Sequence, residues 1–295
     1  MGRVAFVFSG QGDQFPGMGK DLYENYPTAK KVFDLCDSLR EGTSTQCFEG
    51  TAEELKETAN TQPCLFAMEL AAAEVLKEKG YTPEAAAGFS LGEVTAAAFA
   101  GLFDHSTGFS LVCRRGQLMQ AEAEKYDTAM AAVVKLDNET VESLCSQFED
   151  LYPVNFNCPG QVTVSGLSSV MPAFSAKVKE AGGRALPLKV KGAFHSPFMV
   201  PASENFAADL AKASMKTPDI SLYSDVTAEI YDQDPAVLLA KQIASPVHWE
   251  QLIRNMIASG IDTFIEIGPG KTLCNMIKKI DPAVTVMPYT ACLED

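Results

Sequence analysis

Short apolar runs alternate with longer amphipathic stretches in the N-terminal part of the chain. Residues 4–8 form an apolar run that ends in Ser9-Gly10-Gln11-Gly12, which predicts a buried strand followed by a glycine-rich loop. A second short strand is expected over 85–89. Apolar spacing and good helix formers predict helices over 23–39, 62–79, 91–102 and 107–123. This alternation of strands and helices is typical of an α/β domain.

The pattern changes between residues 127 and 190. Two strands there, over 152–158 and 161–165, are joined by a Pro159-Gly160 turn. With the elements on either side, the order is βαββαβ, that of a ferredoxin-like unit. The other elements are strands over 129–136 and 184–190, and helices over 138–148, with Asn138 as N-cap, and over 168–181.

We therefore expect two subdomains. Residues 1–126 and 191–295 form a large α/β subdomain with a parallel sheet, and residues 127–190 form a ferredoxin-like small subdomain inserted into it. In the C-terminal part, a helix is predicted over 193–211 and a buried strand over 263–268. A chain of 295 residues, 46% of them hydrophobic, can bury a core of this size.

Composition and charge disfavour several classes of protein. No apolar run reaches the roughly 18 residues of a membrane span, and no basic and apolar leader opens the sequence, so we expect no membrane partner and no signal peptide. The eight cysteines are scattered without a Cys-x-x-Cys pair, which favours buried free thiols in a reducing cytoplasm over a zinc site or disulfides. A net charge of −14 makes nucleic acid a poor partner. A monomer is the default expectation.

Ser90 stands in Gly88-Phe89-Ser90-Leu91-Gly92, the Gly-x-Ser-x-Gly pattern of a nucleophile elbow. A strand is predicted before it and a helix after it, as in α/β-hydrolases, and the two glycines allow a sharp turn. At the start of that helix, the backbone N–H of Leu91 can face a developing oxyanion. The pattern is loose, so an ordinary helix N-cap is the alternative for Ser90 on this motif alone.

A serine nucleophile needs a base, and the chain offers His105, His195 and His248. His105 is expected at the surface in a turn, and His248 has no evident partner. His195 lies in a loop after a predicted strand, where catalytic groups collect, and it follows the serine as in α/β-hydrolases. From the pattern alone, a hydrogen-bonded loop histidine without a catalytic role is the stronger interpretation of His195.

Several segments, in order along nearly the whole chain, together resemble the malonyl-CoA:acyl-carrier-protein transacylases and the related acyltransferase domains of polyketide synthases. They are the glycine-rich loop at 8–14, the elbow at 88–93, the arginine helix at 114–120, the Asn-x-Asn-x-Pro-x-Gln hairpin at 155–166, Gly-Ala-Phe-His-Ser at 192–196, and closing motifs at 242–249 and 266–273. The elbow alone is a weak signal, whereas the ordered set is specific. The resemblance implies an α/β-hydrolase-like large subdomain.

The resemblance also implies a role for each main residue of the site. Ser90 would attack the malonyl thioester, and His195 would take its proton. The backbone amides of Gln11 and Leu91 would form the oxyanion hole. Arg115 would hold the free carboxylate of malonate, for which a planar guanidinium is suited. An ordinary helix-surface arginine is the alternative for Arg115.

Further residues of the site follow from the same resemblance. The backbone carbonyl of Gln242 would orient the histidine, so no acidic third member is required; a plain helix-end residue is the alternative. Gln161 would contact the substrate. Phe194 accompanies malonyl rather than methylmalonyl use in related acyltransferases, since its ring fills the space that an α-methyl group needs. Phe89 departs from the family, which usually has histidine there, and predicts altered pocket polarity without loss of activity.

The implied reaction is a ping-pong transfer of malonyl from malonyl-CoA to the phosphopantetheine thiol of acyl carrier protein, supplying extender units for fatty-acid synthesis. No metal or redox cofactor is needed, since CoA enters as part of the substrate. The acidic carrier protein would dock on Lys189, Lys191 and Lys271, for which plain solvated lysines are the alternative. The rival functions are a free-standing polyketide-synthase acyltransferase, a thioester hydrolase with the same Ser–His pair, and a non-catalytic scaffold.

Overall fold

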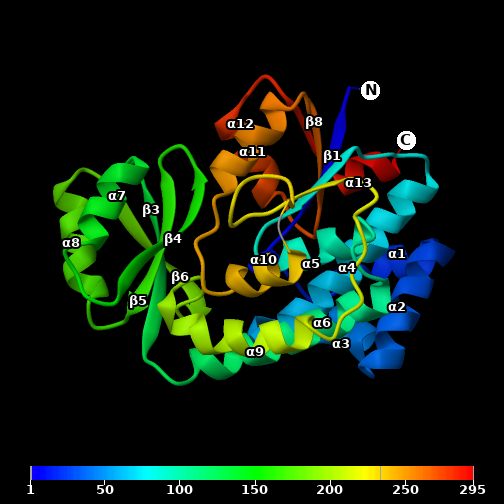
Figure 1. Cartoon of the computed structure of the whole chain (residues 1–295), viewed down its shortest axis with the longest axis horizontal. Coiled ribbons are helices and arrows are strands. Elements are labelled where there is room, and N and C mark those ends of the chain that lie inside the picture. Colours follow the sequence, from blue (N-terminus) through cyan, green and yellow to red (C-terminus); the bar gives the residue numbers. More distant parts are fainter. Residues whose placement is uncertain (1, 233, 295) are drawn as a thin grey trace.

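The computed structural model describes residues 2–232 and 234–294, which form two sheets with flanking helices (Figure 1). The larger sheet has the strand order β7-β2-β1-β8-β9, and each neighbouring pair is parallel. Its strands are β1 (Val4–Phe8), β2 (Ala85–Gly88), β7 (Ser221–Tyr223), β8 (Thr263–Ile267) and β9 (Thr285–Pro288). The predicted α/β architecture with a parallel sheet is confirmed.

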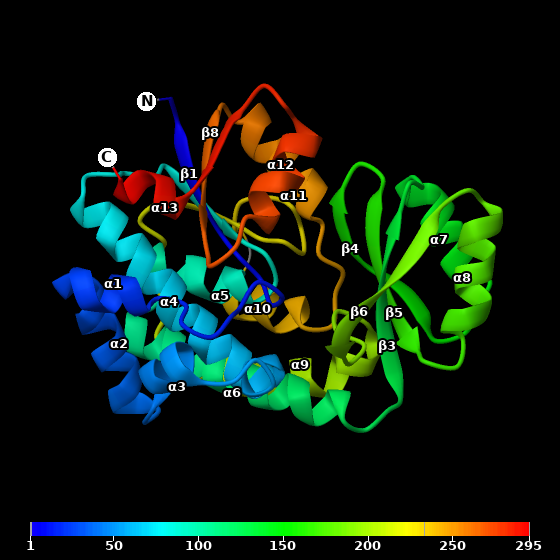
Figure 2. The ribbon, with the colours of Figure 1, turned by 180° about the vertical axis from the view of Figure 1, so that it is seen from behind.

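Helices cover both faces of the larger sheet, because its central strands are buried on both sides. Along β1, Phe6 and Phe8 enter one hydrophobic core, whereas Ala5 and Val7 enter another on the opposite face. The first core is completed mainly by α2 (Pro27–Leu39), α4 (Thr58–Glu78), α5 (Leu91–Phe99) and α6 (His105–Ala123). The second is completed by α11 (Trp249–Ala258) and α12 (Thr272–Ile280). Figure 2 shows the two groups of helices from behind, on opposite sides of the strands.

Further helices complete this part of the molecule. They are α1 (Lys20–Asn25), α3 (Thr43–Glu49), η1 (Glu54–Lys56), η2 (Pro197–Met199), α9 (Val200–Leu210), α10 (Pro235–Gln242) and α13 (Tyr289–Leu293). The sequence patterns did not predict the helices α3, η1, α10, α11, α12 and α13. They also missed the strands β7 and β9, which are only three and four residues long.

The smaller sheet is antiparallel and has the order β4-β5-β3-β6. Its strands are β3 (Thr128–Val134), β4 (Leu151–Cys158), β5 (Gln161–Leu167) and β6 (Arg184–Lys191). Two helices, α7 (Asn138–Cys145) and α8 (Met171–Glu180), pack on one of its faces through a separate core. This is the predicted ferredoxin-like βαββαβ unit. The division into domains at 127 and 190 stays a prediction.

Three local predictions were wrong. The helix expected over 23–39 is two helices, because Pro27 starts α2 and holds Tyr26 in an extended conformation. The helix expected from 193 begins only near Pro197, since His195 has a left-handed φ of 60° and Ser196 is extended. The N-cap of α7 is Asp137 rather than Asn138, and its side chain accepts a hydrogen bond from the Thr140 amide.

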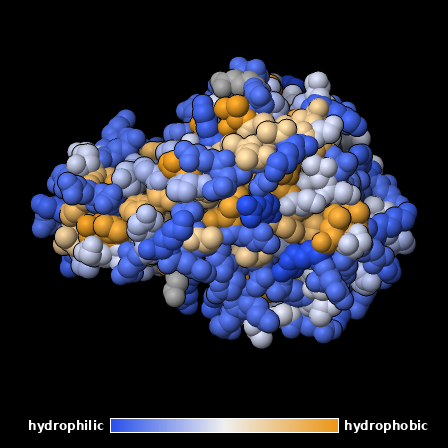
Figure 3. Space-filling model, turned by 60° about the horizontal axis from the view of Figure 1, so that its bottom comes forward, coloured by the Kyte–Doolittle hydropathy of each residue, from blue (hydrophilic) through white to orange (hydrophobic). Residues whose placement is uncertain are grey.

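The surface seen in Figure 3 is largely hydrophilic, with apolar side chains in smaller groups. In the part of the chain that the structure describes, no helix has both the length and the apolar character needed to cross a bilayer. The eight cysteines are thiols rather than disulfides, and all but Cys113 are buried.

Candidate active site

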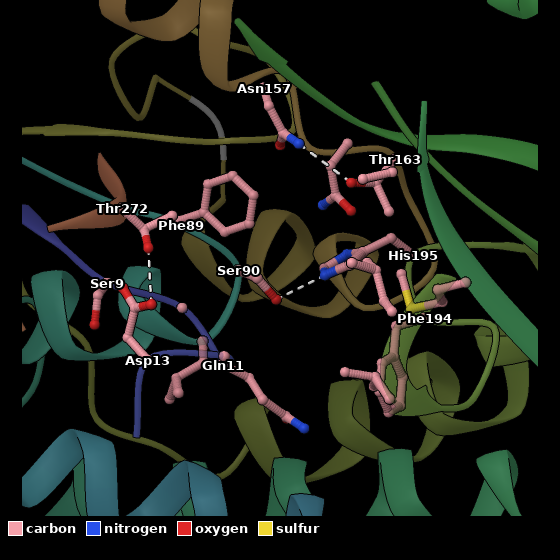
Figure 4. Close-up of a pocket in the computed structure, with 18 of the residues that line it drawn as sticks. Ser9, Gln11, Asp13, Phe89, Ser90, Asn157, Thr163, Phe194, His195 and Thr272 are labelled. Atoms are coloured by element: carbon pink, nitrogen blue, oxygen red, sulfur yellow. Dashed lines mark hydrogen bonds between the residues drawn. The ribbon is translucent and has the colours of Figure 1, made fainter. Parts of the chain in front are cut away.

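A cavity of about 290 Å³ lies between the two sheets (Figure 4). One wall consists of residues 9–13 and 89–91, which follow β1 and β2 at the carboxyl ends of parallel strands, where α/β proteins bind ligands. The opposite wall is the face of the smaller sheet that α7 and α8 leave uncovered, with Met130, Ala132, Thr163 and Leu188. The topology thus places the predicted elbow beside a ligand-sized space.

Ser90 lies at the tip of the turn between β2 and α5, with a strained φ of 54° and ψ of −107°. The turn closes tightly against its surroundings. A Cβ on Gly92 would lie 2.3 Å from the carbonyl oxygen of Phe8, and one on Gly88 would lie 1.9 Å from the carbonyl carbon of Gly92. Both positions therefore require glycine, because neighbouring backbone atoms lie too close for a Cβ, as the elbow interpretation predicted.

The structure brings Ser90 and His195 together although they are far apart in the sequence. The Ser90 Oγ lies 2.6 Å from His195 Nε2. On the other side of the ring, Nδ1 lies 2.9 Å from the backbone carbonyl oxygen of Gln242. A carbonyl can only accept, so Nδ1 carries the proton and Nε2 is free to accept the serine proton. This is the arrangement that a general base requires.

The electrostatic environment keeps His195 neutral. Burial, and then the positive charge of Arg115, lower the pKa of His195 to about 4, against the smaller opposing effect of the hydrogen bond to Gln242. The imidazole therefore carries no charge near pH 7 and can take a proton.

Arg115 projects from α6 toward the serine and is fully buried, with 1% of its surface exposed. Its Nη1 donates to Gln62 Oε1 at 2.9 Å, and its Nη2 donates to Gln242 Oε1 at 2.6 Å and to Ser90 Oγ at 3.2 Å. Burial lowers the pKa of Arg115 only to about 10, so the guanidinium stays charged. Among the described side chains, none of the carboxylates forms an ion pair with it. A buried cation held by neutral amides is suited to receive a ligand carboxylate.

The Gln242 side chain does more than the sequence suggested. Besides accepting from Arg115, its Nε2 donates to the Ser90 carbonyl oxygen at 2.6 Å and to Glu93 Oε2 at 2.8 Å. The Ser90 amide in turn donates to Asp225 Oδ2 at 2.7 Å. Burial and the nearby Glu93 carboxyl raise the pKa of Asp225, which favours the protonated form of Asp225.

Gln62, Asp225 and Tyr231 were not recognised from the sequence as parts of the site. Tyr231 donates its hydroxyl to Glu93, and Gln62 holds Arg115. Each contact joins segments at least 50 residues apart, and no local pattern distinguishes these polar residues from others. Of the four residues in these contacts, Gln62, Asp225, Tyr231 and Glu93, only Glu93 lies inside a motif recognised in the sequence.

Other predicted residues line the same cavity: Gln11, Leu91, Gln161, Phe194 and Phe89. Figure 4 shows the Gln11, Ser90, His195 and Phe194 side chains around one space. Gln161 Oε1 accepts from Lys279 Nζ at 3.5 Å. The Phe89 ring meets Trp249 edge-to-face, with centroids 5.5 Å apart. Phe89 therefore adds an apolar surface beside the nucleophile.

Four other candidates, His105, His248, Lys189 and Lys271, are not among the residues that line this cavity. His105 pairs with Glu74, and His248 stacks on Phe156 with ring centroids 5.2 Å apart. Lys189 and Lys271 are exposed, and the side chain of Lys191 lies outside what the structure describes. The docking role of these lysines stays a prediction.

The Acyl transferase domain family matches residues 5–286. The chain belongs to this family. The malonyl CoA-acyl carrier protein transacylase of Bacillus subtilis is 40% identical over 289 residues, which cover 95% of this chain and 91% of that protein. Among solved structures, the malonyl CoA-acyl carrier protein transacylase of Clostridium perfringens has a TM-score of 0.93 at 33% identity, covering 97% of this chain and 92% of that one. A malonyl-transacylase solved with a type II PKS acyl-carrier protein has a TM-score of 0.92 at 32% identity, covering 97% and 94%.

The family assignment confirms the resemblance derived from the ordered motifs. For this acyl transferase, the geometry adds that Ser90, His195 and Arg115 meet at one cavity. Their individual roles in catalysis stay predictions, which experiments on this chain must test. Among the described residues, no group of three or more His, Cys, Asp and Glu side chains gathers as a metal site would require.

The low pKa of His195 predicts an unusual pH dependence. A protonated imidazole cannot accept the Ser90 proton, so reactivity of the serine should be lost as the pH falls through about 4, rather than near the ordinary value of 6.5. The measurement is the rate of inactivation by a sulfonyl fluoride, which has no titrating group of its own, as a function of pH. Because Arg115 helps to lower this pKa, Arg115→Ala should move the acidic limb upward. An acidic limb near 6.5 in the unmodified protein would contradict the neutral buried imidazole.

Proposed function

We propose that this protein transfers the malonyl group from malonyl-CoA to the phosphopantetheine thiol of an acyl carrier protein, through a malonyl ester on Ser90. The observation that carries the proposal is the buried Arg115 guanidinium, which has only neutral hydrogen-bond partners and lies 3.2 Å from the Ser90 Oγ. A cation placed there matches an acyl group that ends in a carboxylate. The names of the similar transacylases support the same substrate and acceptor.

In the first half-reaction, the Ser90 Oγ attacks the thioester carbonyl carbon while its proton passes to Nε2 of His195. The carbonyl oxygen becomes an oxyanion that accepts hydrogen bonds from the amides of Gln11 and Leu91. Leu91 is the first residue of α5, so its amide has no carbonyl partner within the helix. The C–S bond then breaks, and the imidazolium returns the proton to the departing CoA sulfur.

The second half-reaction runs the same steps in reverse with a new thiol. The carrier protein's phosphopantetheine thiol gives its proton to His195 and attacks the malonyl ester. The Ser90 oxygen leaves and recovers the proton. Both half-reactions exchange one acyl group between oxygen and sulfur, with no change of oxidation state, so the chemistry requires no redox cofactor. We propose that the product feeds chain extension in fatty-acid synthesis.

Exposure of the purified protein to malonyl-CoA should produce a stable malonyl adduct in the intact mass. Ser90→Ala should abolish the adduct, because it removes the attacking oxygen. Addition of holo acyl carrier protein should discharge the adduct and load the carrier. A short-lived adduct with release of free malonate would favour a thioester hydrolase, and the absence of any adduct would favour a non-catalytic scaffold.

Arg115→Ala should lower kcat/KM for malonyl-CoA by about 100-fold, because loss of one partner of a buried charge pair costs about 2–5 kcal/mol. The loss should be much smaller with acetyl-CoA, which has no carboxylate to pair. Steady-state kinetics with both thioesters measure the difference. Arg114→Ala is a matched control, since Arg114 is the neighbouring arginine and forms only a surface ion pair with Asp209. Equal losses for the two thioesters would remove the carboxylate clamp.

Phe194 is 6% exposed and lines the cavity beside His195, where its ring limits the space around the α-carbon of the acyl group. Phe194→Ala should raise the rate with methylmalonyl-CoA relative to malonyl-CoA by about 10-fold or more. Competition between the two thioesters gives the ratio. Phe198→Ala, near Phe194 in the sequence but in contact with Tyr126 outside the cavity, is the control. An unchanged ratio in the Phe194 variant would count against this steric filter.

A further inference from the structure

Glu69 is a buried carboxyl that the reaction does not use. It lies in the middle of α4 and has no exposed surface. Its Oε1 accepts a hydrogen bond from Ser9 Oγ at 2.6 Å, and its Oε2 accepts one from Thr95 Oγ1 at 2.8 Å. Both hydroxyls are themselves buried. The carboxyl therefore links two segments that belong to different elements of the fold.

These two segments each carry one amide of the proposed oxyanion hole. Ser9 follows β1 and precedes Gln11 by two residues. Thr95 lies in α5, about one helical turn after Leu91. The spacing between the two amides thus depends on how the loop after β1 sits against the start of α5, and Glu69 bonds to both.

The contact around Ser9 leaves little freedom for this loop. A Cβ on Gly92 would lie 2.4 Å from the Ser9 carbonyl oxygen, and one on Gly268 would lie 2.3 Å from Ser9 Oγ. The Ser9 amide also donates to the Ile267 carbonyl at 3.0 Å. Ser9 is therefore fixed between α5 and the end of β8, with its hydroxyl directed at Glu69.

Burial of a carboxyl costs free energy, which its hydrogen bonds must offset. Among the described residues, none of the lysines, arginines or histidines forms an ion pair with Glu69. Burial raises the pKa of Glu69 well above its usual range, although the two hydroxyls act in the opposite direction. Its neutral form thus persists to higher pH than that of an exposed glutamate.

We propose that Glu69 is a positioning residue for the oxyanion hole, holding Ser9 and Thr95 so that the amides of Gln11 and Leu91 converge on one oxygen atom. It acts through these two hydroxyls and does not touch the substrate. This inference rests on the proposed acyl transfer, because it assigns Glu69 to the stabilisation of that reaction's tetrahedral intermediates.

The test compares Glu69→Gln with Glu69→Leu in malonyl transfer. Gln can still bond to both hydroxyls, each of which can donate or accept, whereas Leu has similar bulk and can bond to neither. Glu69→Leu should lower kcat and the single-turnover rate of Ser90 acylation by about 10-fold or more, less than the roughly 100- to 1,000-fold cost of deleting an oxyanion donor. KM for malonyl-CoA should change by less than about twofold, because the effect is confined to the transition state. Glu69→Gln should restore most of the rate.

Glu78 provides the matched control, because it is an exposed glutamate on the same helix that also accepts from a threonine hydroxyl, that of Thr28. Glu78→Gln and Glu78→Leu should leave kcat unchanged. If Glu69→Leu does not fold, Ser9→Ala and Thr95→Val test the same links singly. Each should lower kcat at constant KM. The fold-loss of kcat in the double variant should be smaller than the product of the two single losses, because both hydrogen bonds position the same oxyanion hole.

The outcomes separate this proposal from the acyl transfer on which it rests. Absence of a malonyl adduct in the unmodified protein would defeat the proposed function itself. A transferring protein in which Glu69→Leu, or Ser9→Ala and Thr95→Val, keep normal kcat would overturn only the role of Glu69. Equal loss in kcat and in malonyl-CoA affinity, with no rescue by Gln, would overturn it too, since that result indicates general damage to the fold.

Discussion

The hydrogen bonds of Gln242 are the interactions on which the site most depends. Its backbone carbonyl fixes the tautomer of His195, its side-chain oxygen holds Arg115, and its side-chain nitrogen binds the Ser90 carbonyl. The residue is fully buried at the end of α10, so any of these groups left unpaired would incur a desolvation cost. One amide side chain and one carbonyl therefore connect the proposed nucleophile, base and carboxylate clamp.

The ionisable groups around Gln242 form a consistent electrostatic arrangement. Arg115 keeps its charge but has only neutral groups as direct partners. The two carboxyls behind it, Glu93 and Asp225, are buried together, and the pKa of Asp225 is raised as a result. His195 is held neutral by burial and by Arg115. This environment lets the site accept an anionic acyl group without an existing ion pair to break first.

Much of this arrangement could be predicted from the sequence, and the reasons for success and failure are physical. The β1 strand and the elbow have local signatures, an apolar run and two close-approach glycines. The link between Ser90 and His195 required the resemblance to a family, because 105 residues separate them. Gln62, Asp225 and Glu69 were missed since a polar residue in a helix or loop looks the same in sequence whether it faces water or a buried partner. The break at Pro27 was visible, but the apolar pattern was followed across it.

The insertion of the smaller sheet has a consequence for how this enzyme family can diversify. The chain leaves the larger part after α6, which carries Arg115, and returns at the loop that carries His195. The intervening strands contribute Met130, Ala132 and Leu188 to the wall opposite the serine. Substitutions on that wall can reshape the acyl-binding space while the strained elbow and its hydrogen bonds stay intact. One wall of the acyl-binding space is thus encoded in a stretch of the gene separate from the elbow, whereas Arg115 and Phe194 lie outside that stretch.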